Sequence, residues 1–149
     1  MINHNNKIVY IIFLFLLLGC KSQSGFTYWK MHNQTQKDLL AEKEYQKVAP
    51  KNLKIRNDSV LIKFNLSAFK GKYLIINKLD TVSFKNLSVD CGEINRRIPK
   101  SKRKITLEID KNTIVIPIKN NYNFIKVQGL TNDKWNIIYS QFFPKFECM

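Results

Sequence analysis

Histidine is the scarcest chemically active side chain in this sequence. The two histidines are His4 and His32, and both precede the region that carries the strand patterns described below. Residues 35–149 therefore contain no imidazole, which excludes a Ser-His or Cys-His nucleophilic site from that region. We found no catalytic or cofactor motif in the sequence, and we predict that the protein is not an enzyme and uses no cofactor.

Acidic residues are also few. The 149 residues include 11 Asp and Glu against 25 Lys and Arg, so the net charge is +14. A charge of this sign and size favours anionic partners. Nucleic acid is the usual partner of a basic patch, but the export signal described next directs the chain to where nucleic acid is scarce. We therefore predict no physiological nucleic-acid partner.

The longest hydrophobic run, Ile8–Leu18, has eleven residues and follows Lys7. As a helix it would rise about 16 Å, roughly half of a bilayer core, which is the length of a signal-peptide core rather than of a spanning helix. The ending Leu17-Leu18-Gly19-Cys20 resembles the lipobox of bacterial lipoproteins. The resemblance implies cleavage before Cys20 and acylation of its thiol. The alternative is an ordinary secretory signal, but its cleavage site prefers a small residue where Leu17 stands.

This resemblance implies a signal peptide with a helical core (1–19). From the pattern of the remaining residues we predict a lipid-anchored tether (20–34) and a single β-rich domain with a short N-terminal helix (35–149). Cleavage removes one cation, Lys7, and no acid, so the mature net charge is about +13. Two or three acyl chains would make attachment to the membrane effectively permanent. Lys21 stands where an aspartate would resemble an inner-membrane retention signal. The expected location is therefore the cell envelope, at the outer membrane and facing the periplasm.

Aromatic residues crowd the predicted tether. Phe26, Tyr28, Trp29 and Met31 lie within six residues. Rings with one polar end settle in lipid headgroups, so this cluster could lie beside the anchor. We favour the alternative that it docks on the folded domain, because apolar residues close to a domain usually pack on it.

One short helix is predicted before the strands, over residues 35–48. Thr35 is a good N-cap with Asp38 three positions later, as in a capping box, and Pro50 ends the segment.

From residue 53 onward the hydrophobic pattern changes to a period of two, which indicates strands. The predicted strands cover residues 59–66, 73–76, 81–87, 104–109, 113–118, 122–128 and 135–142. Asp110-Lys111-Asn112 and Thr131-Asn132-Asp133 are turns that predict two hairpins. Pro117 lacks an N–H donor, so its strand should be an edge strand. No helical crossovers interrupt the strands, so we predict a mainly β fold, an antiparallel β-sandwich or small barrel of six to eight strands.

The bias toward asparagine, lysine and isoleucine, the lipobox, and residues 132–140 followed by Pro144 resemble a group of small β-sandwich lipoproteins of Bacteroidota. That group has no settled activity, so the resemblance implies no functional residues.

Cys91 and Cys148 remain as thiols once Cys20 is acylated. An even pair in an exported protein is a disulfide candidate, and closing this loop would stabilise the domain by roughly 4 kcal/mol. The competing interpretation is that Cys148 lies too close to the frayed C-terminus to be held near Cys91. A zinc site is not predicted, because two cysteines without nearby histidines supply half of the usual ligands.

Residues 96–104 carry the strongest local charge, with six cations among nine residues. Pro99 and the absence of an apolar period predict a loop. Such runs are often only solvated. The functional alternative is contact with an acidic protein or an anionic envelope surface. The candidate contact residues are Arg96, Arg97, Lys100, Lys102, Arg103 and Lys104.

These patterns favour a lipid-anchored, non-catalytic binding or assembly module. An immunity or inhibitor lipoprotein acting against an envelope-targeting toxin has the same sequence features and is the first alternative. The second alternative is a small hydrolase using two carboxylates, which requires two acids to converge. Its candidates are Asp80, Asp90, Glu93, Glu108, Asp110 and Asp133.

Overall fold

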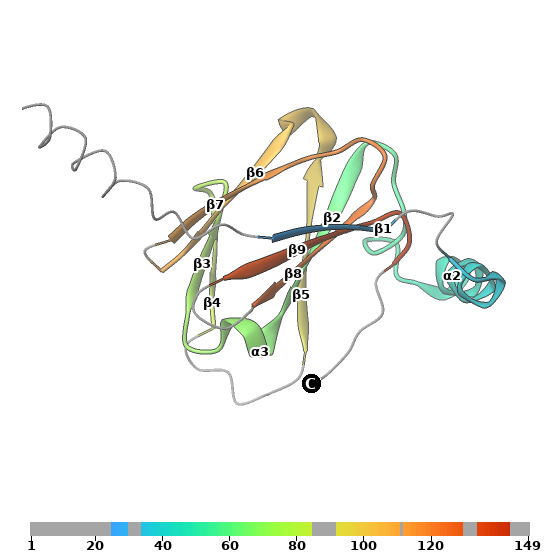
Figure 1. The fold of residues 1–149 in the computed structure, drawn as a ribbon, viewed down its shortest axis with the longest axis horizontal. Helices are drawn as coiled ribbons and strands as arrows, with labels where there is room; N and C mark the ends of the chain where they lie inside the picture. Colours follow the sequence, from blue (N-terminus) through green and yellow to red (C-terminus); the bar gives the residue numbers. More distant parts are fainter. Residues whose placement is uncertain (1–24, 30–33, 85–91, 111, 130–133, 144–149) are drawn as a thin grey trace, which may run out of the picture.

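The structure, a computed structural model, describes residues 25–29, 34–84, 92–110, 112–129 and 134–143. The strands of this part of the chain form two sheets that face each other (Figure 1). The five-stranded sheet has the order β1 (Gly25–Trp29), β9 (Trp135–Ser140), β8 (Phe124–Gly129), β2 (Ser59–Asn65) and β5 (Glu93–Pro99). The four-stranded sheet has the order β4 (Asp80–Ser83), β3 (Tyr73–Ile76), β6 (Lys104–Ile109) and β7 (Asn112–Pro117). The predicted mainly β sandwich is therefore confirmed.

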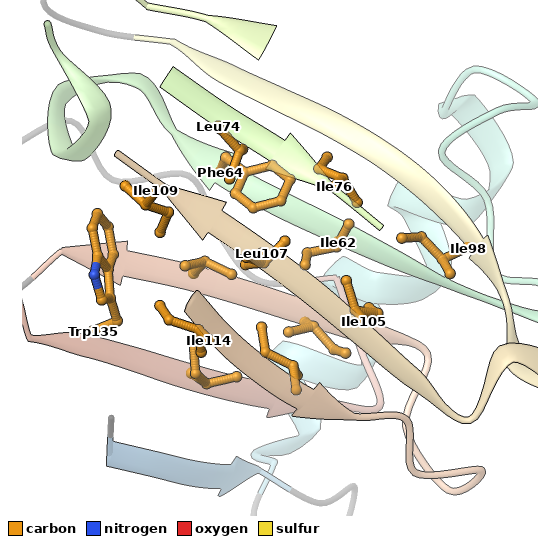
Figure 2. Close-up of a cluster of buried hydrophobic side chains, with 14 of the residues drawn as sticks. Ile62, Phe64, Leu74, Ile76, Ile98, Ile105, Leu107, Ile109, Ile114 and Trp135 are labelled. Carbon is orange, nitrogen blue, oxygen red and sulfur yellow. The ribbon is translucent and has the colours of Figure 1, made fainter. Parts of the chain in front are cut away.

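The space between the sheets is filled by the inward residues of nearly every strand. On β2 these are Val60, Ile62 and Phe64, and on β6 they alternate with polar residues as Ile105, Leu107 and Ile109. Figure 2 shows side chains of both sheets pointing into this shared space. Each such residue contributes about 1.5–3 kcal/mol when it is fully buried. The period of two read from the sequence thus becomes one hydrophobic core.

One end of this core is closed by the short helix α3 (Leu66–Phe69). Its Phe69 stacks on Phe84 with ring centroids 5.2 Å apart and on Trp135 at 4.8 Å. Phe69 also meets Phe64 edge to face at 5.5 Å. Aromatic pairs in these arrangements add to the stabilisation from buried area, so α3 fixes how the two sheets meet.

The predicted helix is confirmed as α2 (Gln36–Val48). The capping box is present, with the Asp38 N–H donating to Thr35 Oγ1 at 3.2 Å and the Thr35 N–H donating to Asp38 Oδ2 at 3.2 Å. The helix lies at the periphery of the sandwich (Figure 1). It is attached through Tyr45, which stacks on Phe143 at 4.1 Å. Among the described helices, none is long and apolar enough to span a membrane.

Both predicted hairpins are confirmed, as the antiparallel pairs β6–β7 and β8–β9. The edge position predicted from Pro117 is confirmed too, because β7 ends the four-stranded sheet. Two pairs are parallel, however: β1 with β9 and β2 with β8. The absence of helical crossovers predicted an antiparallel fold, which holds for the other five pairs. In this fold the chain between β2 and β8 instead builds the four-stranded sheet and β5, which serves as the long connection that a parallel pair needs.

The described residues contain nine strands, against the predicted six to eight. One of the unpredicted strands is β1, which lies within residues 20–34 and pairs with β9. Phe26 and Tyr28 of β1 stack on the buried Tyr139 of β9 at 6.2 and 4.9 Å. The expected docking of the aromatic cluster is confirmed for these two residues, while Met31 falls outside the described ranges.

Candidate functional site

The basic segment 96–104 is not the loop that we predicted. It consists of the end of β5, the 3-10 helix η2 (Lys100–Lys102), Arg103 and the first residue of β6. Strand β5 pairs antiparallel with β2, and Ile98 lies opposite Val60 in the core. The inward positions of β5 are Ile94, Arg96 and Ile98, so an arginine interrupts the apolar alternation. This interruption is the reason that the strand pattern was missed.

Arg96 is bound to the opposite sheet. Its Nε donates to Asp80 Oδ2 in an ion pair between β5 and β4, the adjacent edges of the two sheets. Both side chains are partly exposed, so the pair contributes at most about 1 kcal/mol. The Arg96 guanidinium nevertheless already has an acidic partner within the protein, Asp80.

Arg97 points to the outer side of the five-stranded sheet. Its Nη2 donates to the carbonyl oxygens of Asn52 at 2.7 Å and Lys54 at 2.8 Å, and its Nη1 donates to Ser59 Oγ at 3.3 Å. Desolvation, followed by repulsion from Arg56, lowers the pKa of this guanidinium from its usual value. Arg97 thus fastens the connection between α2 and β2 to β5.

Lys100 joins two turns at one end of the sandwich. Its Nζ donates to the Asn120 carbonyl oxygen at 2.8 Å and to Asn123 Oδ1 at 3.3 Å, both between β7 and β8. Its backbone N–H donates to the Asp58 carbonyl oxygen at 2.8 Å. Desolvation lowers the pKa of the ammonium, while the charge of Asp58 acts in the opposite direction. The roles of Arg96, Arg97 and Lys100 are therefore primarily structural.

Lys102, Arg103 and Lys104 are different, and we call these three residues the basic turn. All three are exposed. Within the described ranges, their side chains have no hydrogen bond or ion pair. Arg103 has a left-handed backbone, with φ of 59°, and its N–H donates to the Lys100 carbonyl oxygen at 3.1 Å. The turn is thus held by its backbone, which leaves three adjacent cationic side chains in solvent.

Lys119 extends the basic turn, although the sequence analysis did not include it. The Ile118 N–H donates to the Arg103 carbonyl oxygen at 2.7 Å, so residues 103 and 118 continue the β6–β7 ladder. Lys119 is the next residue, is exposed, and its Nζ lies 5.2 Å from the centroid of the Tyr28 ring. The register of the predicted hairpin was the signal that could have identified it. We call the basic turn and Lys119 together the basic surface.

The carboxylates of the hydrolase alternative are engaged at different places. Asp80 binds Arg96, Glu93 binds Lys63 at 2.8 Å, and Asp110 lies 3.6 Å from Lys72. Glu108 lies on β6 between Ile75 and Thr113 of the neighbouring strands. Asp90 and Asp133 lie outside the described residues. No group of three or more His, Cys, Asp or Glu in the described part of the chain could hold a metal ion.

The Lys63–Glu93 pair is the most buried charged contact described. Lys63 is 3% exposed on the outer side of β2, and its Nζ lies 3.7 Å from the centroid of the Phe143 ring. Desolvation lowers the pKa of Lys63, and the hydrogen bond with Glu93 partly offsets this effect. The lysine thereby connects β2, β5 and the segment after β9, which is a structural role.

Two predicted sites fall outside the described ranges: the acylation site Cys20 and the candidate disulfide Cys91–Cys148. No family model matches the chain, and no curated protein or solved structure matches it either. The interpretation of the basic surface therefore depends on its own geometry.

Proposed function

We propose that this protein is a lipid-anchored, non-catalytic binding module that takes an acidic partner protein at its basic surface in the cell envelope. The proposal depends on one observation: the cations of segment 96–104 fall into two groups, one bound within the fold and one exposed. Arg96, Arg97 and Lys100 are engaged within the fold, whereas the neighbouring basic turn is exposed and forms no ion pair with any residue that the structure describes. Anchoring is supported by the lipobox-like ending at Cys20.

Charge repulsion makes an inert role for the basic turn less favourable. The three cations stand on adjacent residues and repel one another, by at most about 1 kcal/mol for a pair 4 Å apart in water. An acidic partner would convert this repulsion into attraction, at about 1 kcal/mol per cation as near an anionic lipid surface. Exposed charges are screened over about 8–10 Å at physiological salt, so the binding should weaken as salt increases.

The experiment is a pull-down from envelope extracts with the full chain at low and physiological salt. One variant replaces Lys102, Arg103 and Lys104 with glutamine. The matched control replaces Lys37, Lys43 and Lys134, three exposed lysines outside the basic surface. We expect an acidic protein that is lost from the first variant and retained by the control. Equal capture by both variants would refute the role of the basic turn.

An anionic lipid surface could also supply the negative charge. Binding to lipid vesicles distinguishes this possibility from an acidic partner protein. Protein without acyl chains is mixed with vesicles of phosphatidylglycerol and phosphatidylcholine. Stronger binding to these vesicles than to the captured protein would replace the acidic partner in the proposal with the membrane.

The anchor has its own test. Cells fed a palmitate probe should label the wild-type protein and leave a Cys20→Ala variant unlabelled. Equal labelling of both, or of neither, would remove the lipid anchor from the proposal.

A further inference from the structure

The free side of β7 is an open sheet edge. In the β6–β7 ladder the Ile118 N–H donates to Arg103, which makes 105–116, 107–114 and 109–112 the hydrogen-bonded pairs. The N–H and C=O groups of Thr113 and Val115 therefore point away from β6. None of the described residues forms a hydrogen bond with these four groups. The Pro117 carbonyl oxygen also points outward, and it accepts a hydrogen bond from Tyr139 Oη at 2.6 Å.

The opposite sheet extends one strand beyond this edge. Arg96 and Asp80 place β5 beside β4 at one side, and Tyr139 and Pro117 place β9 beside β7 at the other. With the sheet orders β5-β2-β8-β9-β1 and β4-β3-β6-β7, strand β1 has no counterpart in the four-stranded sheet. The view in Figure 2 shows β1, in blue, as the outermost strand of its sheet. Among the described residues, therefore, no strand pairs with the free side of β7, opposite β1.

The inward side of β1 carries aromatic rings that such a strand would cover. Phe26 and Tyr28 stack on the core residue Tyr139 from the same side, yet they remain 41% and 40% exposed. Val115 of β7 is 52% exposed on the outer side of its sheet. An incoming strand with alternating apolar residues would bury the two rings as well as pair with β7.

Strand β7 also lacks the protection found at the edge strands β4 and β5. Natural edges are commonly shortened or carry charged residues and proline. The described part of β4 is four residues long, and β5 carries Arg96 and Arg97. Strand β7 has six residues, Asn-Thr-Ile-Val-Ile-Pro, without a charged side chain, and its proline stands at the very end. Between these ends, the four residues Thr113–Ile116 are all β-branched and favour pairing with another strand.

The basic surface lies at the Pro117 end of this strand. Lys104 pairs with Pro117 in the ladder, Arg103 with Ile118, and Lys119 follows. A partner strand should therefore carry its acidic residues at that end. Antiparallel addition is the more stable pairing and continues the pattern of the four-stranded sheet. In that orientation the acidic residues come first in the partner segment.

We propose that β7 binds an extended segment of the acidic partner as an added antiparallel strand, with the acidic residues of that segment on the basic surface. Main-chain hydrogen bonds to Thr113 and Val115 supply affinity, and the charges set the direction. This inference rests on the proposed function and specifies its binding mode. A second copy of the chain is disfavoured, because each mature copy carries a net charge of about +13.

The probe is a labelled peptide of three glutamates followed by five alternating threonines and valines, together with its sequence-reversed form. Binding to the full chain is followed by fluorescence anisotropy. Val115→Pro removes an N–H that points away from β6, so the β6–β7 ladder keeps its hydrogen bonds, and Val115→Thr is the matched control. We expect the glutamate-first peptide to bind the control like the wild type and Val115→Pro about tenfold more weakly. The reversed peptide should bind more weakly to the wild type.

Amide hydrogen exchange of the wild type gives a second readout that does not depend on any variant. The Thr113 and Val115 amides should exchange rapidly in the free protein and become protected when the glutamate-first peptide binds. Failure of the peptide to bind, unchanged binding by a folded Val115→Pro variant, or unprotected amides in the complex would each overturn strand addition. Preferred binding of the reversed peptide would overturn the antiparallel orientation.

Two further outcomes separate this inference from the proposed function. Binding that is unaffected by Val115→Pro but lost when the basic turn is neutralised would overturn strand addition and leave the acidic partner in place. Pairing with β7 that is insensitive to neutralisation of the basic turn would contradict the proposed function itself. Protection of the two amides that rises with protein concentration in the absence of peptide would identify a second copy as the occupant, and would also overturn the inference.

Discussion

Replacing Arg97 with methionine tests the division of the basic segment into structural and contact residues. Arg97 and Arg103 carry the same charge and are six positions apart in sequence. Only Arg97 donates to the Asn52 and Lys54 carbonyl oxygens and to Ser59. Arg103→Met is therefore the matched control, because it removes the same charge from an exposed side chain that has no such contacts.

The expected magnitude follows from what each substitution removes. Hydrogen bonds to a charged donor contribute about 1.5–3 kcal/mol each. The carbonyl oxygens of Asn52 and Lys54 lie near the surface and regain water, and methionine relieves the desolvation that lowers the Arg97 pKa. Both effects reduce the stability lost with these hydrogen bonds, so we expect Arg97→Met to lower the free energy of unfolding by about 1.5 kcal/mol. For a domain of this size that corresponds to roughly 4–7 °C in Tm.

Urea unfolding followed by tryptophan fluorescence measures the difference, because the Trp135 ring is 2% exposed in the core and becomes exposed on unfolding. Arg103→Met should unfold within about 0.5 kcal/mol of the wild type, as an exposed substitution does. The pull-down should give the opposite ranking, with the larger loss of partner for Arg103→Met. Equal stability of the two variants would refute the structural role of Arg97. Equal loss of the partner in the pull-down would show that Arg97 belongs to the contact surface.

Three further predictions address the fold. Tyr139→Phe leaves the Pro117 carbonyl oxygen without its donor and should cost about 1–2 kcal/mol, whereas Tyr28→Phe at the exposed ring should cost less in the same urea titration. The lowered pKa of Lys63 means that the folded protein releases this proton before the unfolded chain does. The free energy of unfolding should therefore rise with pH just below the ordinary lysine value of 10.5, and Lys63→Met should abolish that rise in urea titrations across this pH range. Gly71 has φ of +78° and open space around it, so Gly71→Val should destabilise by roughly 1–2 kcal/mol through backbone strain alone, while Gly71→Asn should lower Tm less.

The elements that could be predicted from the sequence are those in which each residue signals the same structure. In β6 every second residue enters the core, and the α2 capping box needs contacts only between Thr35 and Asp38. Strand β5 could not be predicted because Arg96 occupies an inward position and obscures the period. Strand β1 is five residues long, and its parallel partner β9 lies more than 100 residues later in the chain. Local patterns carry little information about such a distant pairing.

The same reasoning explains why a run of six cations does not become one charged patch. Consecutive strand residues face opposite sides of a sheet, so Arg96 turns toward the opposite sheet and Arg97 toward the outer side. Strand pairing ends at Pro99, and Lys100 is directed into the neighbouring loop. Only beyond this point do the cationic side chains become free of internal partners among the described residues. The charge available to a partner is therefore set by where β5 stops, and lengthening β5 by one residue would rearrange which cations the partner meets.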